Sequence, residues 1–372
     1  MRKLTFLLML FVACGLHAQA IVDEASSTLQ PALQQLGRRL LRHKTGSIVA
    51  MEPATGRVLC LVTNSSEGEK PSLAIATPYP PASTMKTAEA LMLYSEGIID
   101  DETTVACQGA MRTANIRVRC HTHASPLRLA NALAYSCNTW FLNTFLEMMA
   151  DRSRYETKDS AITVWNRYMR SMGLGGPTGI DLDGEKGGLL ANANYLNRRY
   201  NGRWNGQTIM WIAMGQGDVT VTPLQLCVLA SSIANRGWWY RPHLHDYAPG
   251  HPLWHRYSTA HFTKATPAAY DAVIEGMRQA VLRGTLTGMK SAPYAICGKT
   301  GTAETAGRDH SAFIGFAPMD EPAIAVCVYV EHGGFGADTA APIASLIMEQ
   351  YLTGGLSATA QRKATILSAK TF

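Results

Sequence analysis

The chain has 372 residues, of which 47% are hydrophobic and only 17% are charged. A chain of this size and composition buries one large core or two modest ones, which excludes a disordered protein. No uninterrupted run of about 18 apolar residues appears, which argues against a polytopic membrane protein. The formal net charge of +6, from 34 basic and 28 acidic residues, comes without a Lys/Arg block, so no nucleic-acid partner is expected.

Residues 1–20 have the three regions of a secretory signal. Two basic residues precede an apolar run that ends at Val12, and Ala18-Gln19-Ala20 follows as a small-x-small cleavage site. We therefore expect a signal peptide and an exported protein, periplasmic or associated with the cell envelope. Cys14 ends a loose lipoprotein cleavage box, so a lipid anchor on this cysteine is the alternative.

The first elements after this leader are a helix and a hairpin. Leucines recur at helical spacing over residues 26–43, which predicts an amphipathic helix. The β-type runs 48–52 and 57–63 flank Pro53-Ala54-Thr55-Gly56, which predicts two strands joined by a turn. From about residue 83 to 237 the pattern is mainly helical, with glycine-rich breaks.

The carboxy-terminal part returns to strands. Three β-type runs follow the helical region, over residues 294–298, 312–317 and 323–330. A helix is predicted over 339–351, and residues 354–372 are expected to form a poorly ordered tail. This order predicts an α/β fold with one mainly antiparallel central sheet of about five strands, flanked by helices and carrying a largely helical insertion. We expect one domain over residues 21–353.

Ser83 and Lys86 form a Ser-x-x-Lys pattern at the start of a predicted helix that stops at Gly97. Three residues are close to one helical turn, so the Lys86 amine can reach the Ser83 hydroxyl. A serine needs a nearby base to act as a nucleophile, and a lysine shielded from water beside other cations can serve. Alone the pattern is weak, because a capping serine followed by a surface lysine gives the same spacing.

Two further motifs strengthen this interpretation. Ser136-Cys137-Asn138 lies on an apolar segment, and Lys299-Thr300-Gly301-Thr302 lies on the first of the predicted carboxy-terminal strands. The order Ser-x-x-Lys, Ser-x-Asn, Lys-Thr-Gly is the active-site set of penicillin-binding proteins and class A β-lactamases.

With these motifs the chain resembles the penicillin-binding protein transpeptidases, and most closely the transpeptidase domain of the class B elongation type. The resemblance covers roughly residues 28–351, and five motifs carry it in family order: Tyr79–Lys86, Ala134–Thr139, Thr178–Leu182, Gly215–Gly217 with Val221–Gln225, and Gly298–Glu304. It implies the penicillin-binding, serine β-lactamase-like fold. It also implies peptidoglycan D,D-transpeptidase activity without a cofactor for acyl transfer, covalent inhibition by β-lactams, and cell-wall polymerase partners.

The resemblance also implies a role for each motif residue. Ser83 would attack the penultimate D-Ala carbonyl of a stem peptide, Lys86 would take its proton, and backbone N–H groups of Ser83 and Thr302 would hold the oxyanion. Ser136 would relay a proton to the leaving group while Asn138 binds the peptide amide. Lys299 would supply positive charge for the substrate carboxylate. The expected substrate-binding residues are Thr300, Gly301, Thr302, Gly215, Gln216 and Gly217, although the last three fit a tight structural turn equally well.

Four further residues have the spacing Cys-x12-Cys-x2-His-x13-Cys, namely Cys107, Cys120, His123 and Cys137. Their types match a Cys3His zinc site, and the resemblance adds weight because some elongation-type relatives hold zinc with a ligand inside the Ser-x-Asn motif. A Cys107–Cys120 disulfide in an oxidising compartment explains the same residues, so zinc and disulfide both stay open. The other cysteines after the leader lie in apolar runs and are expected to be buried: Cys60, Cys227, Cys297 and Cys327.

Three other functions share part of this pattern. A serine β-lactamase also uses Ser83, Lys86 and Lys299, but it has to activate a deacylating water, and the chain has no Glu-x-x-Leu-Asn segment. A D,D-carboxypeptidase differs from a transpeptidase only in accepting water instead of an amine. A non-catalytic β-lactam sensor would be acylated and stop there.

Overall fold

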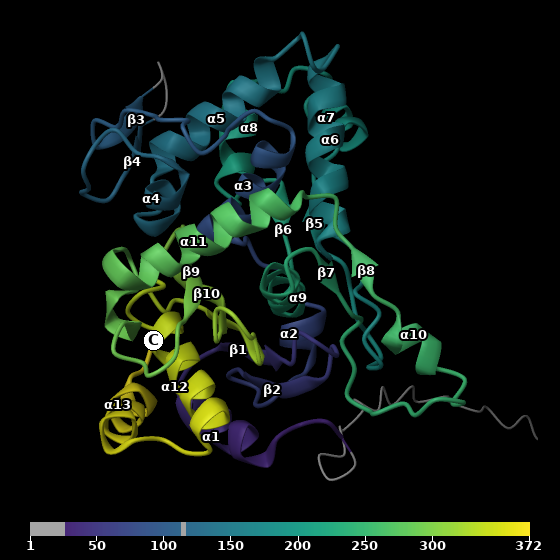
Figure 1. Ribbon diagram of the computed structural model, residues 1–372, viewed down its shortest axis with the longest axis vertical. Coiled ribbons are helices and arrows are strands. Elements are labelled where there is room, and N and C mark those ends of the chain that lie inside the picture. Colours follow the sequence, from purple (N-terminus) through teal and green to yellow (C-terminus); the bar gives the residue numbers. More distant parts are fainter. Residues whose placement is uncertain (1–26, 113–116) are drawn as a thin grey trace, which may run out of the picture.

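A five-stranded antiparallel sheet brings the two ends of the chain together (Figure 1). The computed structural model describes residues 27–112 and 117–372, so the predicted signal peptide and Cys14 lie outside the described residues. The strand order is β2-β1-β11-β10-β9. The bounds are Gly46–Met51 for β1, Val58–Asn64 for β2, Cys297–Ala303 for β9, His310–Ala317 for β10 and Ile324–Val330 for β11. The predicted α/β class and the mainly antiparallel sheet are confirmed.

Helices cover both faces of this sheet. Helix α9 (Pro223–Ala234) packs on one face, and α1 (Pro31–Leu41) and α12 (Ala340–Thr353) pack on the other. Strand β11 shows why both faces need cover: Val326 and Val328 join the core beneath α1 and α12, while Cys327 and Tyr329 join the core beneath α9. Since alternate residues point to opposite faces, a strand buried on both sides needs the continuous apolar run seen in the sequence.

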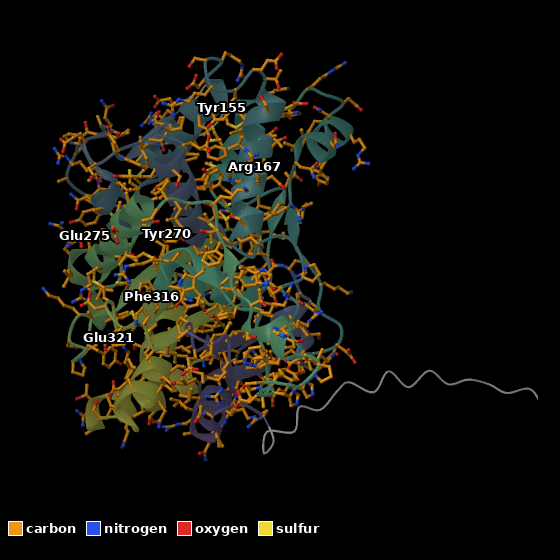
Figure 2. All side chains as sticks on the ribbon, turned by 45° about the vertical axis from the view of Figure 1, so that its right-hand side comes forward. Tyr155, Arg167, Tyr270, Glu275, Phe316 and Glu321 are labelled. Atoms are coloured by element: carbon orange, nitrogen blue, oxygen red, sulfur yellow. The ribbon has the colours of Figure 1, made fainter. Side chains whose placement is uncertain are left out.

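The helical insertion forms a second part of the molecule, seen above the sheet in Figure 1. Its main helices are α3 (Met85–Ser95), α4 (Leu129–Ala134), α5 (Asn138–Ala150), α6 (Lys158–Ser171) and α8 (Gly206–Ala213). Helix α11 (Pro267–Arg283) packs on both parts, because it contacts α3 and α4 as well as β9. Figure 2 shows the result: Tyr270 of α11 and Phe316 of β10 lie inside, whereas Glu275 and Glu321 face solvent.

The remaining elements are short. They are α2 (Ser72–Ile75), the 3-10 turn η2 (Ala82–Thr84), β3 (Ala110–Arg112), β4 (Arg117–Arg119), β5 (Leu189–Leu190), α7 (Ala193–Arg199), β6 (Val219–Thr220), β7 (Trp238–Trp239), α10 (Trp254–Ser258), β8 (His261–Phe262), the 3-10 turn η3 (Thr287–Met289) and α13 (Ala358–Ala369). None of the helices in the described part of the chain is long and apolar enough to cross a bilayer.

The expectation of a poorly ordered tail over residues 354–372 is wrong. Helix α13 occupies most of this segment, and the Ser357 side chain caps its first turn by accepting from Ala360 N. The ammonium of the buried Lys44 donates to Leu367 O at 2.7 Å and to Lys370 O at 2.9 Å. The apolar face of α13 is carried largely by alanine, which gives little periodic signal but allows close packing.

Candidate active site

Ser83 lies in the 3-10 turn η2, which leads directly into α3. The predicted helix start is therefore tighter than an α-helical turn. Its neighbour Thr84 donates its hydroxyl to Pro81 O at 2.5 Å, and Ala82 has a φ of +50°. Ser83 itself is half-buried, so its hydroxyl is open to a ligand while the residues around it are packed.

Two glycines hold the turn that carries Ser83. Gly215 accepts a hydrogen bond from Ala82 N at 2.9 Å, and a Cβ at position 215 would lie 2.4 Å from Ala82 O. On the other side, a Cβ at Gly301 of β9 would lie 3.1 Å from both Pro81 O and Thr84 Cγ2. Any larger side chain would push the turn away, so both positions have a geometric reason to be glycine.

Lys86 is the second residue of α3 and is completely buried. Its ammonium donates to Ser136 O at 3.0 Å, to Ser136 Oγ at 3.4 Å and to Asn138 Oδ1 at 2.5 Å. In the described part of the chain, none of its hydrogen bonds reaches Ser83 Oγ. Burial lowers the pKa of Lys86 to about 8, although the thiol of Cys137 and other acidic groups oppose this shift.

Lys299 enters the same site from the strand β9 and is also completely buried. Its ammonium donates to Ser136 Oγ at 2.8 Å and to Thr300 O at 2.9 Å. Burial and the nearby charge of Lys86 hold the pKa of Lys299 well below its ordinary value. The two lysines therefore disfavour each other's charged form, and Ser136 Oγ is the atom that they share.

Ser136 reaches this position because the chain turns sharply between α4 and α5. Its φ is +54°, an uncommon conformation for a residue other than glycine, and strained residues of this kind cluster at functional sites. Asn138 begins α5 and is fixed on its other side, since its Nδ2 donates to Arg119 O at 2.7 Å. The structure thus brings together Lys86, Ser136, Asn138 and Lys299, which span more than half of the sequence.

Strand β9 is the last strand of the sheet, paired with β10 on one side only. Thr302 lies on this edge strand, and its hydroxyl accepts from Gly336 N at 3.4 Å. A free strand edge beside a nucleophile can bind an extended peptide by adding it as a further strand.

Two neighbours of these residues were missed by the sequence analysis. Thr285 follows α11 and places its hydroxyl 3.1 Å from the hydroxyl of Thr300, and Glu89 is a buried carboxyl one turn beyond Lys86. Neither belongs to a recognisable motif. Thr285 is held by a long-range bond from its N to Ala134 O at 3.1 Å, which no local pattern shows.

The segment Gly215–Gly217 is a tight turn in the structure. Gly215 and Gly217 have φ values of +66° and +68°, and Gln216 is buried with its N donating to Trp211 O at 2.9 Å. The contact between Gly215 and Ala82 favours the structural interpretation of this motif, in which it supports the turn that carries Ser83.

Cys107, Cys120, His123 and Cys137 converge on one point. One ligand atom from each lies within 4.8 Å of all the others. The thiols of Cys107, Cys120 and Cys137 are not joined in disulfides, and the sulfurs of Cys120 and Cys137 are 3.9 Å apart. The structure therefore has the predicted convergence and not the Cys107–Cys120 disulfide.

The donor set suits a metal ion. His123 uses Nδ1 for a 2.7 Å contact with Ala124 O, while its buried Nε2 has no hydrogen-bond partner among residues 27–112 and 117–372. A metal-binding histidine is typically oriented in this way, with the second nitrogen on a carbonyl. The contact between the Cys137 and Cys120 sulfurs lowers the pKa of Cys120 and raises that of Cys137, so without a metal ion the thiolate of this pair lies on Cys120.

Comparison with known proteins agrees with this geometry. The family described as "Penicillin binding protein transpeptidase domain" matches residues 46–349. The peptidoglycan D,D-transpeptidase MrdA of Acinetobacter baumannii is 30% identical over 368 residues, which cover 85% of this chain and 52% of that protein. This chain spans about half the length of the curated relatives that it first matches.

Solved structures share the fold. The crystal structure of Pseudomonas aeruginosa PBP2 in complex with WCK 5153 superposes with a TM-score of 0.76 at 28% identity, covering 90% of this chain and 77% of that one. A chain from a peptidoglycan synthase complex, described as coordinating polymerization and crosslinking, gives a TM-score of 0.75 at 25% identity, with coverages of 89% and 63%. The motif order, the sheet and these matches together show that the chain belongs to the penicillin-binding protein transpeptidase domain family.

Proposed function

We propose that this chain is a peptidoglycan D,D-transpeptidase that crosslinks stem peptides through an acyl-enzyme on Ser83 and is inhibited covalently by β-lactams. The observation that supports this most directly is the position of Ser136 Oγ, 2.8 Å from Lys299 Nζ and 3.4 Å from Lys86 Nζ. A hydroxyl between two buried amines can pass protons from one reacting group to the next. The named activity of the MrdA relative supports the same reaction.

In the first half of the reaction, Ser83 Oγ attacks the carbonyl carbon of the penultimate D-Ala and its proton passes to Lys86. Burial supports this role of Lys86, because it lowers the pKa and so increases the fraction of free amine near neutral pH. Backbone N–H groups of Ser83 and Thr302 stabilise the oxyanion. When the peptide C–N bond breaks, the leaving D-Ala nitrogen takes a proton through Ser136 Oγ, and an ester remains on Ser83.

In the second half, an amine from another stem peptide attacks the ester carbonyl. The new amide bond is the crosslink, and Ser83 Oγ regains a proton through the same groups. The free edge of β9 binds the donor peptide as an added strand, and Lys299, Thr300 and Thr302 receive its terminal carboxylate. Water in place of the amine gives the D,D-carboxypeptidase alternative.

Covalent labelling tests the nucleophile. The purified chain is incubated with a fluorescent penicillin, and the adduct is measured by intact mass. Wild type should gain one adduct and Ser83→Ala none, whereas Ser95→Ala, at the far end of the same helix, should label normally. An adduct on the Ser83→Ala chain would refute the assignment of Ser83.

Product analysis separates the competing functions. Incubation with sacculi followed by muropeptide analysis should give crosslinked dimers for a transpeptidase and shortened stems for a carboxypeptidase. Sustained turnover of nitrocefin would instead identify a serine β-lactamase. Labelling without change in the muropeptides would identify a sensor.

We also infer that Cys107, Cys120, His123 and Cys137 hold a structural zinc ion. Three thiolates and one imidazole complete a tetrahedral shell, in which Zn–S bonds of about 2.3 Å put two sulfurs roughly 3.8 Å apart. The 3.9 Å between the Cys120 and Cys137 sulfurs fits this shell. The ion would fix Ser136 and Asn138 through Cys137 and would take no part in acyl transfer.

Elemental analysis tests the zinc assignment. Protein purified without chelator should carry one equivalent of zinc, Cys120→Ser should lose it, and Cys297→Ala, a buried cysteine outside the cluster, should keep it. Wild-type protein with no zinc and a full count of free thiols would contradict the assignment.

The location and partners follow from the same function. We propose that residues 1–20 are removed on export, that residues 21–353 form the transpeptidase domain and that the protein works in the periplasm or envelope, where its substrate lies. The synthase complex named among the structural neighbours supports a cell-wall polymerase as partner. Amino-terminal sequencing should begin at Ile21, and a lipid-modified Cys14 would show membrane anchoring instead.

A further inference from the structure

A second cavity, of about 420 Å³, shares none of its lining residues with the acyl-transfer site. It lies between the turn before Gly179, the end of α6 and the strands β7 and β8, which are found to the right of α9 in Figure 1, whereas β9 lies to the left. Three arginines line it, Arg170, Arg241 and Arg256.

Neutral acceptors hold these three arginines. Arg170 Nε donates to Asn166 Oδ1 at 2.9 Å, one guanidinium N–H of Arg241 donates to the carbonyl of Arg256 at 3.3 Å, and one of Arg256 donates to Gly179 O at 3.5 Å. In the part of the chain that the structure describes, none of the three lies within ion-pair distance of a carboxylate. Arg170 and Arg256 are exposed and Arg241 is half-buried, so three guanidinium groups without a direct ion pair to a described carboxylate border one open cavity.

The carboxylates of Asp181 and Glu185 lie near the cavity and accept hydrogen bonds from groups other than the three arginines. Asp181 accepts from Leu244 N at 2.7 Å and from Tyr247 OH at 2.9 Å. Glu185 accepts from Thr178 N at 2.6 Å and from Gly179 N at 2.8 Å. No acidic residue lines the cavity. Like charges gathered around one cavity repel each other unless an anion lies between them.

Gly179 lies close to two of the arginines that line the cavity. A Cβ at Gly179 would lie 3.0 Å from Arg241 Nε and 3.3 Å from a terminal nitrogen of Arg256, and the φ of +87° at this position favours glycine. Trp239 and His261 line another part of the wall with stacked rings, whose centroids are 4.5 Å apart. Trp239 is buried, so the half-buried His261 is the more accessible of the two rings.

We propose that this cavity is a second binding site, for an oxyanion with two or more negative charges. The forked N–H groups of arginine match carboxylate and phosphate oxygens equally well, so the ligand is a polycarboxylate or a phosphate compound. The volume exceeds that of a single phosphate and leaves room for attached groups. A wall fragment with several stem-peptide carboxylates is one source, and that source rests on the proposed function; a soluble phosphate compound is the other.

Calorimetric titration of the full chain with pyrophosphate, and separately with a disaccharide tetrapeptide, tests the site. At least one probe should bind, and the binding should weaken as NaCl is added. The double variant Arg241→Gln with Arg256→Gln should bind at least tenfold more weakly, because each lost charged hydrogen bond costs on the order of tenfold. Arg152→Gln is the matched control, an exposed arginine held by Met149 O at 3.0 Å outside the cavity; it should bind like wild type.

The outcomes separate this inference from the proposed function. Binding of the tetrapeptide identifies a wall-derived ligand, and binding of pyrophosphate alone identifies a phosphate compound; both support the site. No binding of either probe, or equal binding by the double variant, overturns it. Penicillin labelling of the same samples is the independent readout, since labelling without anion binding sinks only this inference, and anion binding without labelling sinks only the acyl transfer.

Discussion

The two lysines of the acyl-transfer site come from the two parts of the molecule and are held differently. Lys86 projects from a helix and donates to a backbone carbonyl, a hydroxyl and an amide oxygen, all within the segment 136–138. Lys299 projects from the edge strand and donates to the same Ser136 hydroxyl and to its own neighbour, Thr300.

The difference suggests that the two lysines have different roles. Lys86 depends on the local geometry of one short turn, so it suits a proton-transfer step that needs exact placement. Lys299 is fixed by the sheet and lies on the strand that would receive substrate, so it suits recognition of charge. The following predictions test whether the two lysines really differ in this way.

Lys86→Ala should give the largest effect. Without the amine, Ser83 has no base, and acylation by a fluorescent penicillin should slow about 10²- to 10⁴-fold. The measurement is the second-order labelling rate, with circular dichroism as the check on folding. A labelling rate equal to that of wild type would remove Lys86 from the mechanism.

The pH dependence of acylation should report Lys86. The reaction needs the free amine, and its pKa of about 8 means that the neutral fraction rises about tenfold per pH unit below that value. The labelling rate should therefore rise about fiftyfold from pH 6 to pH 8 and level off above about pH 9. A flat profile over this range would contradict the assignment of Lys86 as base.

Lys299→Ala should act mainly on binding. Losing one charged hydrogen bond to the carboxylate should weaken labelling by about thirtyfold, through the binding constant rather than the maximal rate. Saturation kinetics at increasing penicillin concentration separates the binding constant from the maximal rate. If the maximal rate falls instead, Lys299 also takes part in proton transfer, and the two lysines do not have separate roles.

Removal of zinc should affect Lys86 on α3 more than Lys299 on β9. Cys137 lies between Ser136 and Asn138, the residues that hold Lys86, so chelation should misplace them and slow acylation on the order of tenfold. Restoring zinc should restore the rate. The maximal rate should fall while the binding constant changes little, and the opposite pattern would argue that the cluster supports Lys299.

Glu89→Met should give the smallest effect and should concern stability. Both carboxyl oxygens of Glu89 are buried without a hydrogen-bond partner in the described part of the chain, and burial raises its pKa well above the ordinary value. A raised pKa means that its contribution to stability is complete below about pH 4.3 and is lost as the pH rises through the native value. Methionine should therefore stabilise the protein by about 1 kcal/mol at neutral pH.

Urea unfolding at pH 5 and pH 8 measures this change. The gain from Glu89→Met should be larger at pH 8, where wild type carries the cost of the buried carboxyl. An equal or greater gain at pH 5 would show that Glu89 has a compensating partner at neutral pH.

Much of the sheet could be predicted because strands buried on both faces require apolar runs, and β11 is such a run. The motif residues could be found because their spacing and order are specific to one family. Helix α13 could not, since its packing rests on alanines and on the distant Lys44. The partners Thr285 and Glu89 became visible only in three dimensions, because long-range packing places them beside the motif residues.

The Cys/His cluster shows most clearly what could not be decided from the sequence alone. Spacing along the chain identified all four residues, yet it fits a disulfide as well as a metal site. The choice depends on the distances between the sulfurs and on the orientation of the His123 ring, which only the three-dimensional structure gives.

The open edge of β9 also affects how readily the protein associates with itself. An unpaired strand edge is a surface on which a second copy could dock, and proteins normally block such edges to prevent aggregation. Here the edge has to stay open if it receives substrate. Six of the seven residues of β9 are buried and Thr302 is half-buried, so little of the strand is exposed to a second copy.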